Sequence, residues 1–209
     1  MTEGKGATRA YHHGNLLRVL LDTAIALIAE KGVEALSMRD LAKRAGVSPG
    51  APFRHFRSKT ALVTAVAEEA MARLTAAVRA EIAASPDDPI ETLRAIGRGY
   101  LDWAIDNPTH FAVVSSRSLI DFTSSVPLVE ENEAIRLLML DVLGRAQERG
   151  MLRVGLILDD LMFGARAQVY GLARMWVDGH FDEWKVDGDP RERMFAALDL
   201  YIGGIVSRA

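Results

Sequence analysis

The side chains best suited to binding phosphate are concentrated in the first 60 residues of this 209-residue chain. That segment holds 10 Lys and Arg against 5 Asp and Glu, whereas the remaining residues hold 15 against 23. His12, His13 and His55 lie in the same basic segment. A basic segment joined to an acidic body attracts phosphate locally without binding nucleic acid over the whole protein surface. The charge distribution therefore favours contact with a nucleic acid through the N-terminal part.

A helix-turn-helix pattern occupies residues 37–59, at the C-terminal end of this basic segment. Ser37 can cap a short helix, and Gly46 suits the C-terminal end of that helix. Ser48 can cap the next short helix, with Pro49 in its first position, where a missing N–H costs nothing. Ser58 can cap a third helix with a basic start. Because two short helices joined by a tight glycine turn place the second helix in the DNA major groove, the pattern predicts DNA binding.

The rest of the sequence predicts an all-α protein with two parts. Residues 1–13 are polar and lack helical periodicity, so we expect a flexible basic arm there. A DNA-binding domain covers 14–62, and the Pro/Asp cluster at 85–89 marks the boundary to a helical body over 86–209. No segment alternates convincingly with the period of a strand. The predicted helices cover residues 15–31, 58–84, 90–106, 108–116, 126–149, 157–180 and 190–207.

Residues 11–62 resemble the DNA-binding domain of the TetR/AcrR family of bacterial transcriptional regulators. The resemblance implies an N-terminal three-helix helix-turn-helix domain followed by a helical-bundle domain for ligand binding and dimerisation. It also implies a ligand-responsive repressor that binds a palindromic operator as a homodimer and is released by a small apolar effector. The matching motifs are Tyr11-His12-His13-Gly14-Asn15-Leu16, Leu36-Ser37-Met38-Arg39-Asp40-Leu41-Ala42, Ala45-Gly46-Val47-Ser48, Phe53-Arg54-His55-Phe56 and Lys59-Thr60-Ala61-Leu62.

By this resemblance the recognition helix runs from about Pro49 to Phe56. Gly50 and Ala51 either let the backbone approach the base edges or only permit a tight turn. Arg54 can reach a guanine or a phosphate, whereas Phe53 lacks the hydroxyl of the family's frequent Tyr, which favours packing over contact. The residues predicted to contact DNA are Ser37, Arg39, Ser48, Pro49, Gly50, Ala51, Phe53, Arg54, His55 and Lys59.

Lys59 is the most informative of these predicted contacts. A lysine in the first turn of a helix opposes the helix dipole, but a phosphate beside it reverses the sign of that effect. His55 can contact a phosphate or pack beside Phe56. For Ser37 and Ser48, helix capping alone is a sufficient alternative to phosphate contact.

The body carries a predicted dimer face and a predicted ligand pocket. Interior glycines weaken helices, yet the last two long helices contain several, which allows close packing either within one chain or between two. The residues predicted at the dimer interface are Gly164, Ala167, Gly171, Gly203 and Gly204. Aromatic and Met side chains suit an apolar pocket, although most such residues are simply core. The candidate pocket residues are Trp103, Phe111, Phe122, Met139, Met162, Phe163, Tyr170 and Trp176.

The sequence offers little support for other classes of protein. It has no cysteine, no catalytic or nucleotide-binding motif and no 18-residue apolar run, so we expect no catalytic residue, metal, cofactor or membrane segment and a cytoplasmic location. Two alternatives stay open: a helical-bundle enzyme or small-molecule carrier, and a DNA-binding protein without an effector. Of the three hypotheses, only that of a ligand-responsive regulator predicts release of the protein from duplex DNA by a metabolite.

Overall fold

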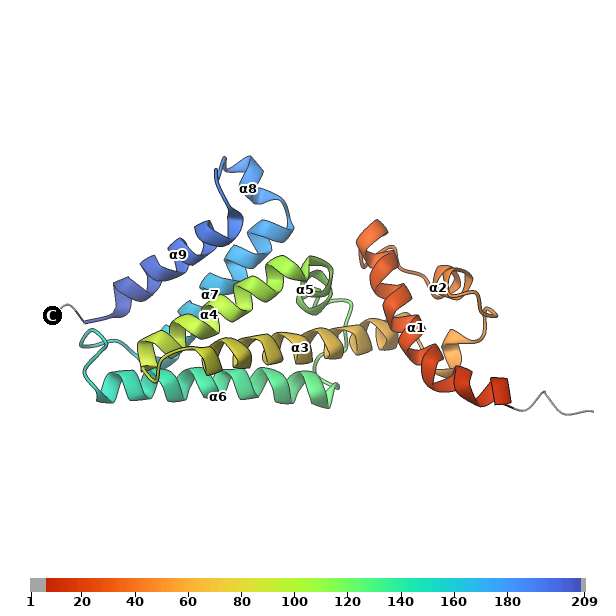
Figure 1. The fold of residues 1–209 in the computed structure, drawn as a ribbon, viewed down its shortest axis with the longest axis horizontal. Helices are drawn as coiled ribbons and strands as arrows, with labels where there is room; N and C mark the ends of the chain where they lie inside the picture. The colour runs from red at the N-terminus through yellow and green to blue at the C-terminus, as the bar shows by residue number, and fades with distance from the viewer. Residues whose placement is uncertain (1–6, 208–209) are drawn as a thin grey trace, which may run out of the picture.

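The computed structural model describes the backbone of residues 7–207 and the side chains of residues 16–207. In that part of the chain, a small helical head lies at one end and a larger helical body at the other, with one long helix running between them (Figure 1). An isolated bridge between Leu152 and Val206 is the only β pairing in 7–207. The predicted all-α fold is confirmed. The elements are α1 Ala7–Lys31, α2 Met38–Arg44, the 3₁₀ turn η1 Pro52–Arg54, α3 Lys59–Ala84, α4 Pro89–Asp106, α5 Pro108–Ser115, α6 Val126–Glu148, α7 Leu158–Val177, α8 His180–Glu183 and α9 Pro190–Ile205.

The first helix begins earlier than the periodicity predicted. α1 starts at Ala7, so residues 7–13 of the predicted flexible arm are helical instead. Ala and Arg at positions 7, 9 and 10 have high helix propensity, and they extend the helix that the apolar pattern placed from residue 15. The remainder of the predicted arm, residues 1–6, lies outside the described residues.

The helices of the head begin and end at the capping residues that the sequence indicated. Ser37 caps α2 by accepting a hydrogen bond from the Asp40 amide at 3.1 Å, and Ser58 caps α3 by accepting one from the Ala61 amide at 3.0 Å. Gly46 has φ of +68°, and the amides of Gly46 and Val47 donate back to carbonyls of the last turn of α2. This is a Schellman ending, which requires the left-handed conformation that glycine adopts most easily.

Replacing Gly46 by alanine is expected to destabilise the head. A left-handed backbone costs an L-residue roughly 1–2 kcal/mol, so Gly46→Ala should lower the free energy of unfolding by about that amount in a urea titration. Gly50→Ala is the matched control, because Gly50 has no positive φ and an added Cβ there would meet nothing within 4 Å. Equal stability losses in the two variants would contradict the turn geometry.

The long helix α3 belongs to both parts of the molecule. Its first turns are buried in the head, and its later turns pack along α4 and α6 in the body (Figure 1). Between these regions the Thr64 hydroxyl accepts a hydrogen bond from the Asp121 amide at 2.9 Å, and Glu68 accepts one from the Ser125 hydroxyl at 2.7 Å. One continuous helix therefore joins the head, the α5–α6 loop and the body.

The predicted domain boundary at 85–89 coincides with the turn between α3 and α4. Asp88 caps α4 there by accepting hydrogen bonds from the amides of Ile90 and Glu91 at 2.9 and 3.0 Å. Proline and the capping aspartate end one helix and start the next, but the two helices remain packed together. The breaker cluster therefore separates two helices that pack on each other.

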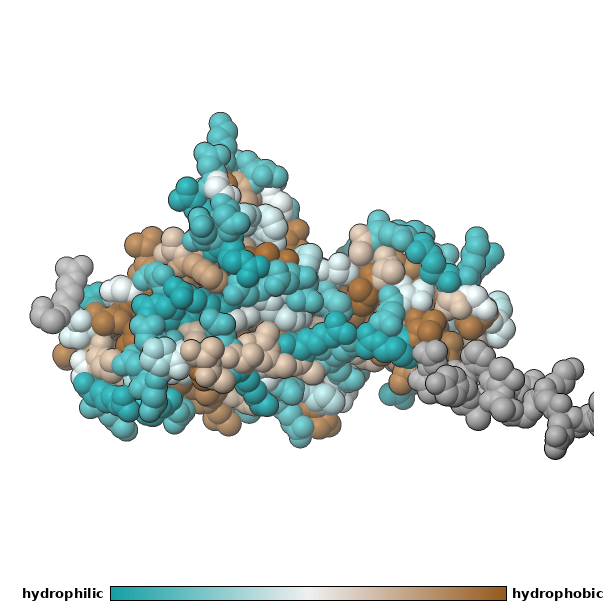
Figure 2. All heavy atoms as spheres, in the orientation of Figure 1, coloured by the Kyte–Doolittle hydropathy of each residue, from teal (hydrophilic) through white to brown (hydrophobic). Residues whose placement is uncertain are grey.

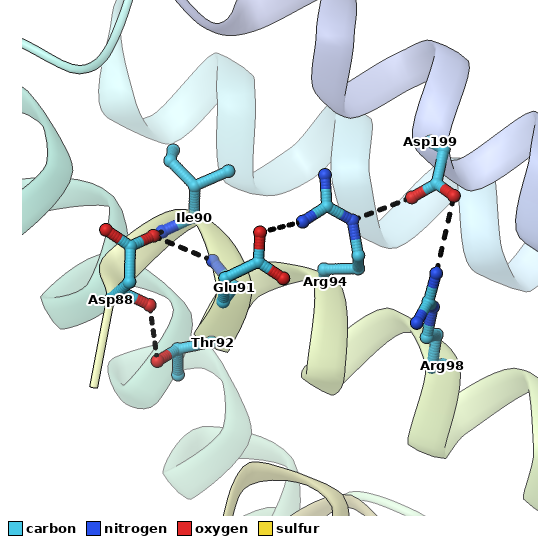
Figure 3. A network of polar contacts seen from close by, with 7 residues as sticks. All are labelled: Asp88, Ile90, Glu91, Thr92, Arg94, Arg98 and Asp199. Carbon is cyan, nitrogen blue, oxygen red and sulfur yellow. Dashed lines mark hydrogen bonds and ion pairs between the residues drawn. The ribbon is translucent and has the colours of Figure 1, made fainter. Parts of the chain in front are cut away.

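The C-terminal helix is tied to α4 by ion pairs (Figure 3). Asp199 of α9 accepts hydrogen bonds from Arg94 at 2.7 Å and from Arg98 at 3.4 Å, and Glu91 forms a further ion pair with Arg94. Partly exposed ion pairs of this kind add little stability, so we take their role to be fixing how α9 lies on α4. The predicted helix over 157–180 ends at Val177, because Gly179 has a left-handed backbone and α8 follows as a separate turn.

Candidate nucleic-acid interface and ligand cavity

The recognition segment is a mixture of turns and a short 3₁₀ helix rather than the predicted helix over 49–56. The Ala51 amide donates to the Ser48 carbonyl at 2.9 Å, and the Arg54 amide donates to the Ala51 carbonyl at 3.2 Å. Pro52 occupies the first position of η1, where its lack of an N–H removes a bond that a continuous α-helix would make. The proline therefore explains the tighter pitch, and the described hydrogen bonds do not include the predicted cap by the Ser48 side chain.

Most of the residues predicted to contact DNA are exposed on this segment. Pro49, Gly50, Arg54 and His55 are all exposed, as their role in contacting bases or phosphates requires. Ala51 is the exception, because only 9% of it is accessible and its methyl group packs inward. In this conformation Ala51 supports the turn and offers no surface to a base.

Phe53 lies on the outside of the recognition segment, contrary to the expectation that it packs. It is 53% exposed, although the next aromatic residue, Phe56, is buried in the core of the head. An exposed aromatic ring beside Arg54 is available for apolar contact with thymine methyl groups or the sugar edge. His55 is exposed as well, with its ring centre 6.4 Å from that of Phe56.

Apart from Lys59 and from Arg18, which pairs with Asp22 and Glu69, the described cations of the head divide into two groups. Arg44 binds Glu30 through two hydrogen bonds of 2.8 and 2.7 Å, and Lys31 lies 3.7 Å from Asp40, so these two hold α1 against α2. The second group is exposed and, among the described side chains, has no carboxylate within 4.0 Å: Arg39, Lys43, Arg54 and Arg57. Of these, Lys43 and Arg57 were missed by the sequence reasoning, which could not tell free cations from paired ones.

Lys59 has a structural role that the sequence did not reveal. Its ammonium group donates a hydrogen bond to the Glu34 carbonyl in the loop between α1 and α2. That contact offsets part of the unfavourable interaction with the dipole of α3. An ammonium group has three donors, so Lys59 can hold this loop and still bind a phosphate.

Removing Lys59 should weaken DNA binding by a similar factor for every sequence. Lys59→Ala is expected to lower the slope of log K against log salt by about 1, because one phosphate contact and its released counterion are lost. The measurement is fluorescence anisotropy of a labelled duplex over a salt series. Lys185→Ala removes the same charge from the loop after α8 and should leave the slope unchanged. An unaltered slope in Lys59→Ala would remove this residue from the interface.

The body encloses a cavity of about 460 Å³ between α3, α4, α5, α6, α7 and α9. Its lining is mainly aliphatic and aromatic, and Phe111 lies fully buried with its ring centre 6.2 Å from Tyr100 and 6.0 Å from Tyr170. The size and the apolar lining suit a small-molecule site. Met71, Leu74 and Val78 contribute to the lining from α3, the same helix that carries Lys59.

The structure brings half of the predicted pocket residues to this cavity. Phe111, Met139, Phe163 and Tyr170 line it. The other four lie elsewhere: Trp103 is buried in the core, Met162 packs beside the core, Trp176 packs on Phe181 with ring centres 5.9 Å apart, and Phe122 stacks under Arg117. Residue type alone could not separate these groups, because core and cavity both use aromatic and Met side chains.

The predicted dimer residues also separate into different roles. A Cβ at Gly164 would lie 2.8 Å from the Tyr201 hydroxyl, which donates to the Leu161 carbonyl at 3.0 Å, so Gly164 packs α7 on α9 of the same chain. Ala167 lines the cavity. Gly203 and Gly204 are exposed, and the half-buried Gly171 has no atom within 4 Å of an added Cβ.

Large apolar side chains stand exposed on the same two helices. Phe163 of α7 is 71% exposed and Leu200 of α9 is 79% exposed, and Figure 2 shows apolar residues along the edge of the molecule where α9 lies. Large exposed apolar side chains grouped in this way are uncommon on the surface of a monomeric protein and usually mark an interaction site. Leu200 lies one turn before Gly203 and Gly204, but it is not among the predicted interface residues, because an exposed leucine and a core leucine look alike in the sequence.

Two arginines at the cavity were also missed by the sequence reasoning. Arg166 of α7 donates a hydrogen bond to the Tyr100 hydroxyl at 3.0 Å, and Arg117 lies over the Phe122 ring at 3.7 Å. Desolvation lowers the pKa of Arg117, and the charge of Arg166 lowers it further. Burial raises the pKa of Tyr100, while Arg166 acts in the opposite direction. Arginine does not contribute to the apolar periodicity of a helix, so the sequence pattern did not indicate that either residue lies at the cavity.

Two other kinds of site can be checked against the described residues. Among the side chains that the structure describes, those of 16–207, no group of three or more His, Cys, Asp or Glu is arranged to hold a metal ion. No helix in that range is both long enough and apolar enough to cross a membrane.

Comparison with known proteins gives matches over both parts of the chain. Residues 20–66 match the family described as bacterial regulatory proteins, tetR family, and residues 93–199 match the tetracyclin repressor-like C-terminal domain. The HTH-type transcriptional repressor KstR2 of Mycobacterium tuberculosis is 31% identical over 144 residues, which is 67% of this chain and 70% of the relative. The HTH-type transcriptional regulator BetI of Yersinia pestis is 38% identical over 84 residues, or 40% of this chain and 42% of the relative.

Solved structures give the same fold over nearly the whole chain. A protein of unknown function from Rhodococcus sp. RHA1 superposes with a TM-score of 0.77 at 30% identity, covering 95% of this chain and 100% of the other. The ketosteroid transcriptional regulator KstR2 of Mycobacterium tuberculosis superposes with a TM-score of 0.70 at 23% identity, covering 100% of both chains.

Proposed function

Because the chain belongs to the TetR family of bacterial regulatory proteins, and is therefore a DNA-binding transcriptional regulator, we propose that it is a cytoplasmic repressor controlled by a small molecule bound in the body. In this proposal a homodimer places its two recognition segments on a palindromic operator. Binding of an effector in the cavity favours a conformation whose head spacing no longer fits the operator. The proposal includes no catalytic step.

The observation that carries the proposal is the continuity of α3. Its N-terminal turn holds Lys59 against the head, and Met71, Leu74 and Val78 from the same helix line the cavity. Its 26 residues span about 39 Å at 1.5 Å each, so a small tilt at the cavity becomes a larger displacement at the head. An effector changes operator affinity only as far as its affinities for the two conformations differ.

The dimer is supported by the exposed apolar surface of α7 and α9. Phe163 and Tyr170 both line the cavity and lie on the exposed side of α7, so a partner packed there would adjoin the opening of the cavity. Two-fold pairing also suits helix-turn-helix recognition, because each head reads one half-site and two half-sites give the affinity that one short segment cannot.

The experiment is footprinting of the purified dimer on the DNA upstream of its own gene. We expect two protected half-sites related by two-fold symmetry and about one helical turn apart. Failure to prefer this DNA over a random duplex at low ionic strength would contradict the proposal that it contains the operator. The footprinting is repeated with candidate metabolites. Footprints that none of them removes would instead favour the alternative of an effector-independent DNA-binding protein.

A further inference from the structure

The cavity of the body carries positive charge and no compensating negative charge. Its lining includes Arg117 and Arg166, and among the described residues no Asp or Glu takes part in it. The surrounding body is acidic, with 23 Asp and Glu against 15 Lys and Arg after residue 60. Arginines elsewhere in the body, such as Arg94, Arg136 and Arg191, form ion pairs with carboxylates. The two cavity arginines are therefore cationic in a place where the protein supplies no anion.

The geometry of Arg166 leaves donors free. One guanidinium nitrogen donates to the Tyr100 hydroxyl at 3.0 Å, and the group lies 5.0 Å and 5.3 Å from the ring centres of Tyr100 and Tyr170. Contacts with the ring faces hold the guanidinium plane and leave the N–H groups at its edge available. Because Arg has five donors, a single bond to a tyrosine hydroxyl does not satisfy it.

Arg117 completes the charged side of the cavity at its opening. The side chain is exposed, and its guanidinium stacks at 3.7 Å on the Phe122 ring. Among the described side chains no carboxylate forms an ion pair with Arg117, and Arg166, Tyr170 and Tyr100 line the same cavity. Two like charges held near each other without an acid are unfavourable unless an anion joins them.

We propose that the effector is an amphiphilic anion, with a carboxylate or phosphate head bound by Arg117 and Arg166 and an apolar tail in the cavity. This inference rests on the proposed function, since it names the chemical class of ligand for the same cavity. The tail is received by aliphatic side chains such as Leu93, Ile96 and Val169. A planar guanidinium binds both head groups through paired hydrogen bonds, so the two arginines fit either.

The test compares three probes with the same tail: dodecanoate, dodecyl phosphate and dodecan-1-ol. Isothermal titration calorimetry of the full chain, with each probe below its micelle concentration, gives the affinities. At least one anion should bind about tenfold or more tightly than the alcohol, as charge-assisted hydrogen bonds require. The tighter of the two anions identifies the head group. Equal binding of the alcohol and both anions would overturn the inference and leave the ligand cavity in place.

Substitutions locate the head group. Arg117→Met and Arg166→Met should each weaken binding of the favoured anion by about tenfold and change alcohol binding by less than about twofold. Arg136→Met, which removes an arginine paired with Glu133, is the control and should change neither. Thermal unfolding checks that Arg166→Met still folds, and Arg166→Lys retains the charge if it does not. Equal weakening of anion and alcohol binding would overturn the assignment of the head group to these arginines. Absence of binding by all three probes would overturn both the ligand-binding role of the cavity and the inference.

Discussion

Replacing Leu200 by arginine is expected to convert the proposed dimer into a monomer and to reduce operator affinity by about 10²-fold or more. Leu200 is 79% exposed in the single chain, so the substitution does not disturb the core. In a two-fold interface the new charge would appear twice and be buried without a partner. Since joining two half-site contacts raises affinity by about 10²–10⁴-fold, separating the subunits removes that gain. Sedimentation velocity and anisotropy on the operator give the two readouts.

The matched control for this variant is Leu137→Arg. Leu137 of α6 is also a large exposed side chain, at 53%, but it lies on a helix outside the proposed interface. It should leave both the molecular mass and the operator affinity unchanged. A dimeric Leu200→Arg protein with normal operator affinity would show that α9 does not form the interface, and dissociation in both variants would point to a different pairing.

The sequence located the helix-turn-helix and its ends because these depend on local chemistry. Ser37, Gly46 and Ser58 cap or end helices through bonds within a few residues, so their types and spacing predict the geometry directly. Pro52 lies within the predicted recognition helix, where a proline alters the pitch in a way that the local pattern does not specify. The structure resolves that effect as a 3₁₀ turn with Ala51 buried and Phe53 exposed.

Interactions between distant segments could not be predicted in the same way. Residues such as Arg166 and Tyr100 are 66 positions apart, and nothing in their local pattern indicates that they meet. The breaker cluster at 85–89 predicts an interruption of the chain, but the end of a helix and the end of a domain use the same residue types. Only the packing of α3 on α4 shows that the cluster is a turn between two packed helices.

A large loss of stability is also expected from Gly99→Ala, because α3 and α4 approach each other closely at this residue. A Cβ at Gly99 would lie 2.9 Å from the Val78 Cα and 3.3 Å from the Ala77 carbonyl oxygen, both in the backbone of α3. A side chain could rotate away, but backbone atoms cannot move without separating the two helices. Overpacking of this kind typically costs about 1–3 kcal/mol, and we expect Gly99→Ala to lower the free energy of unfolding by that amount in a urea titration.

Gly144→Ala provides the comparison within the same fold. Gly144 also lies inside a helix, α6, but an added Cβ would meet no atom within 4 Å. Alanine there gains helix propensity and restricts the unfolded chain, so stability should stay level or rise by about 0.4–1 kcal/mol. Because Val78 lines the cavity, Gly99→Ala should also shift α3 and weaken binding of the favoured amphiphile, whereas Gly144→Ala should not. Equal stability in the two variants would mean that α3 and α4 do not approach as closely as the distances at Gly99 indicate.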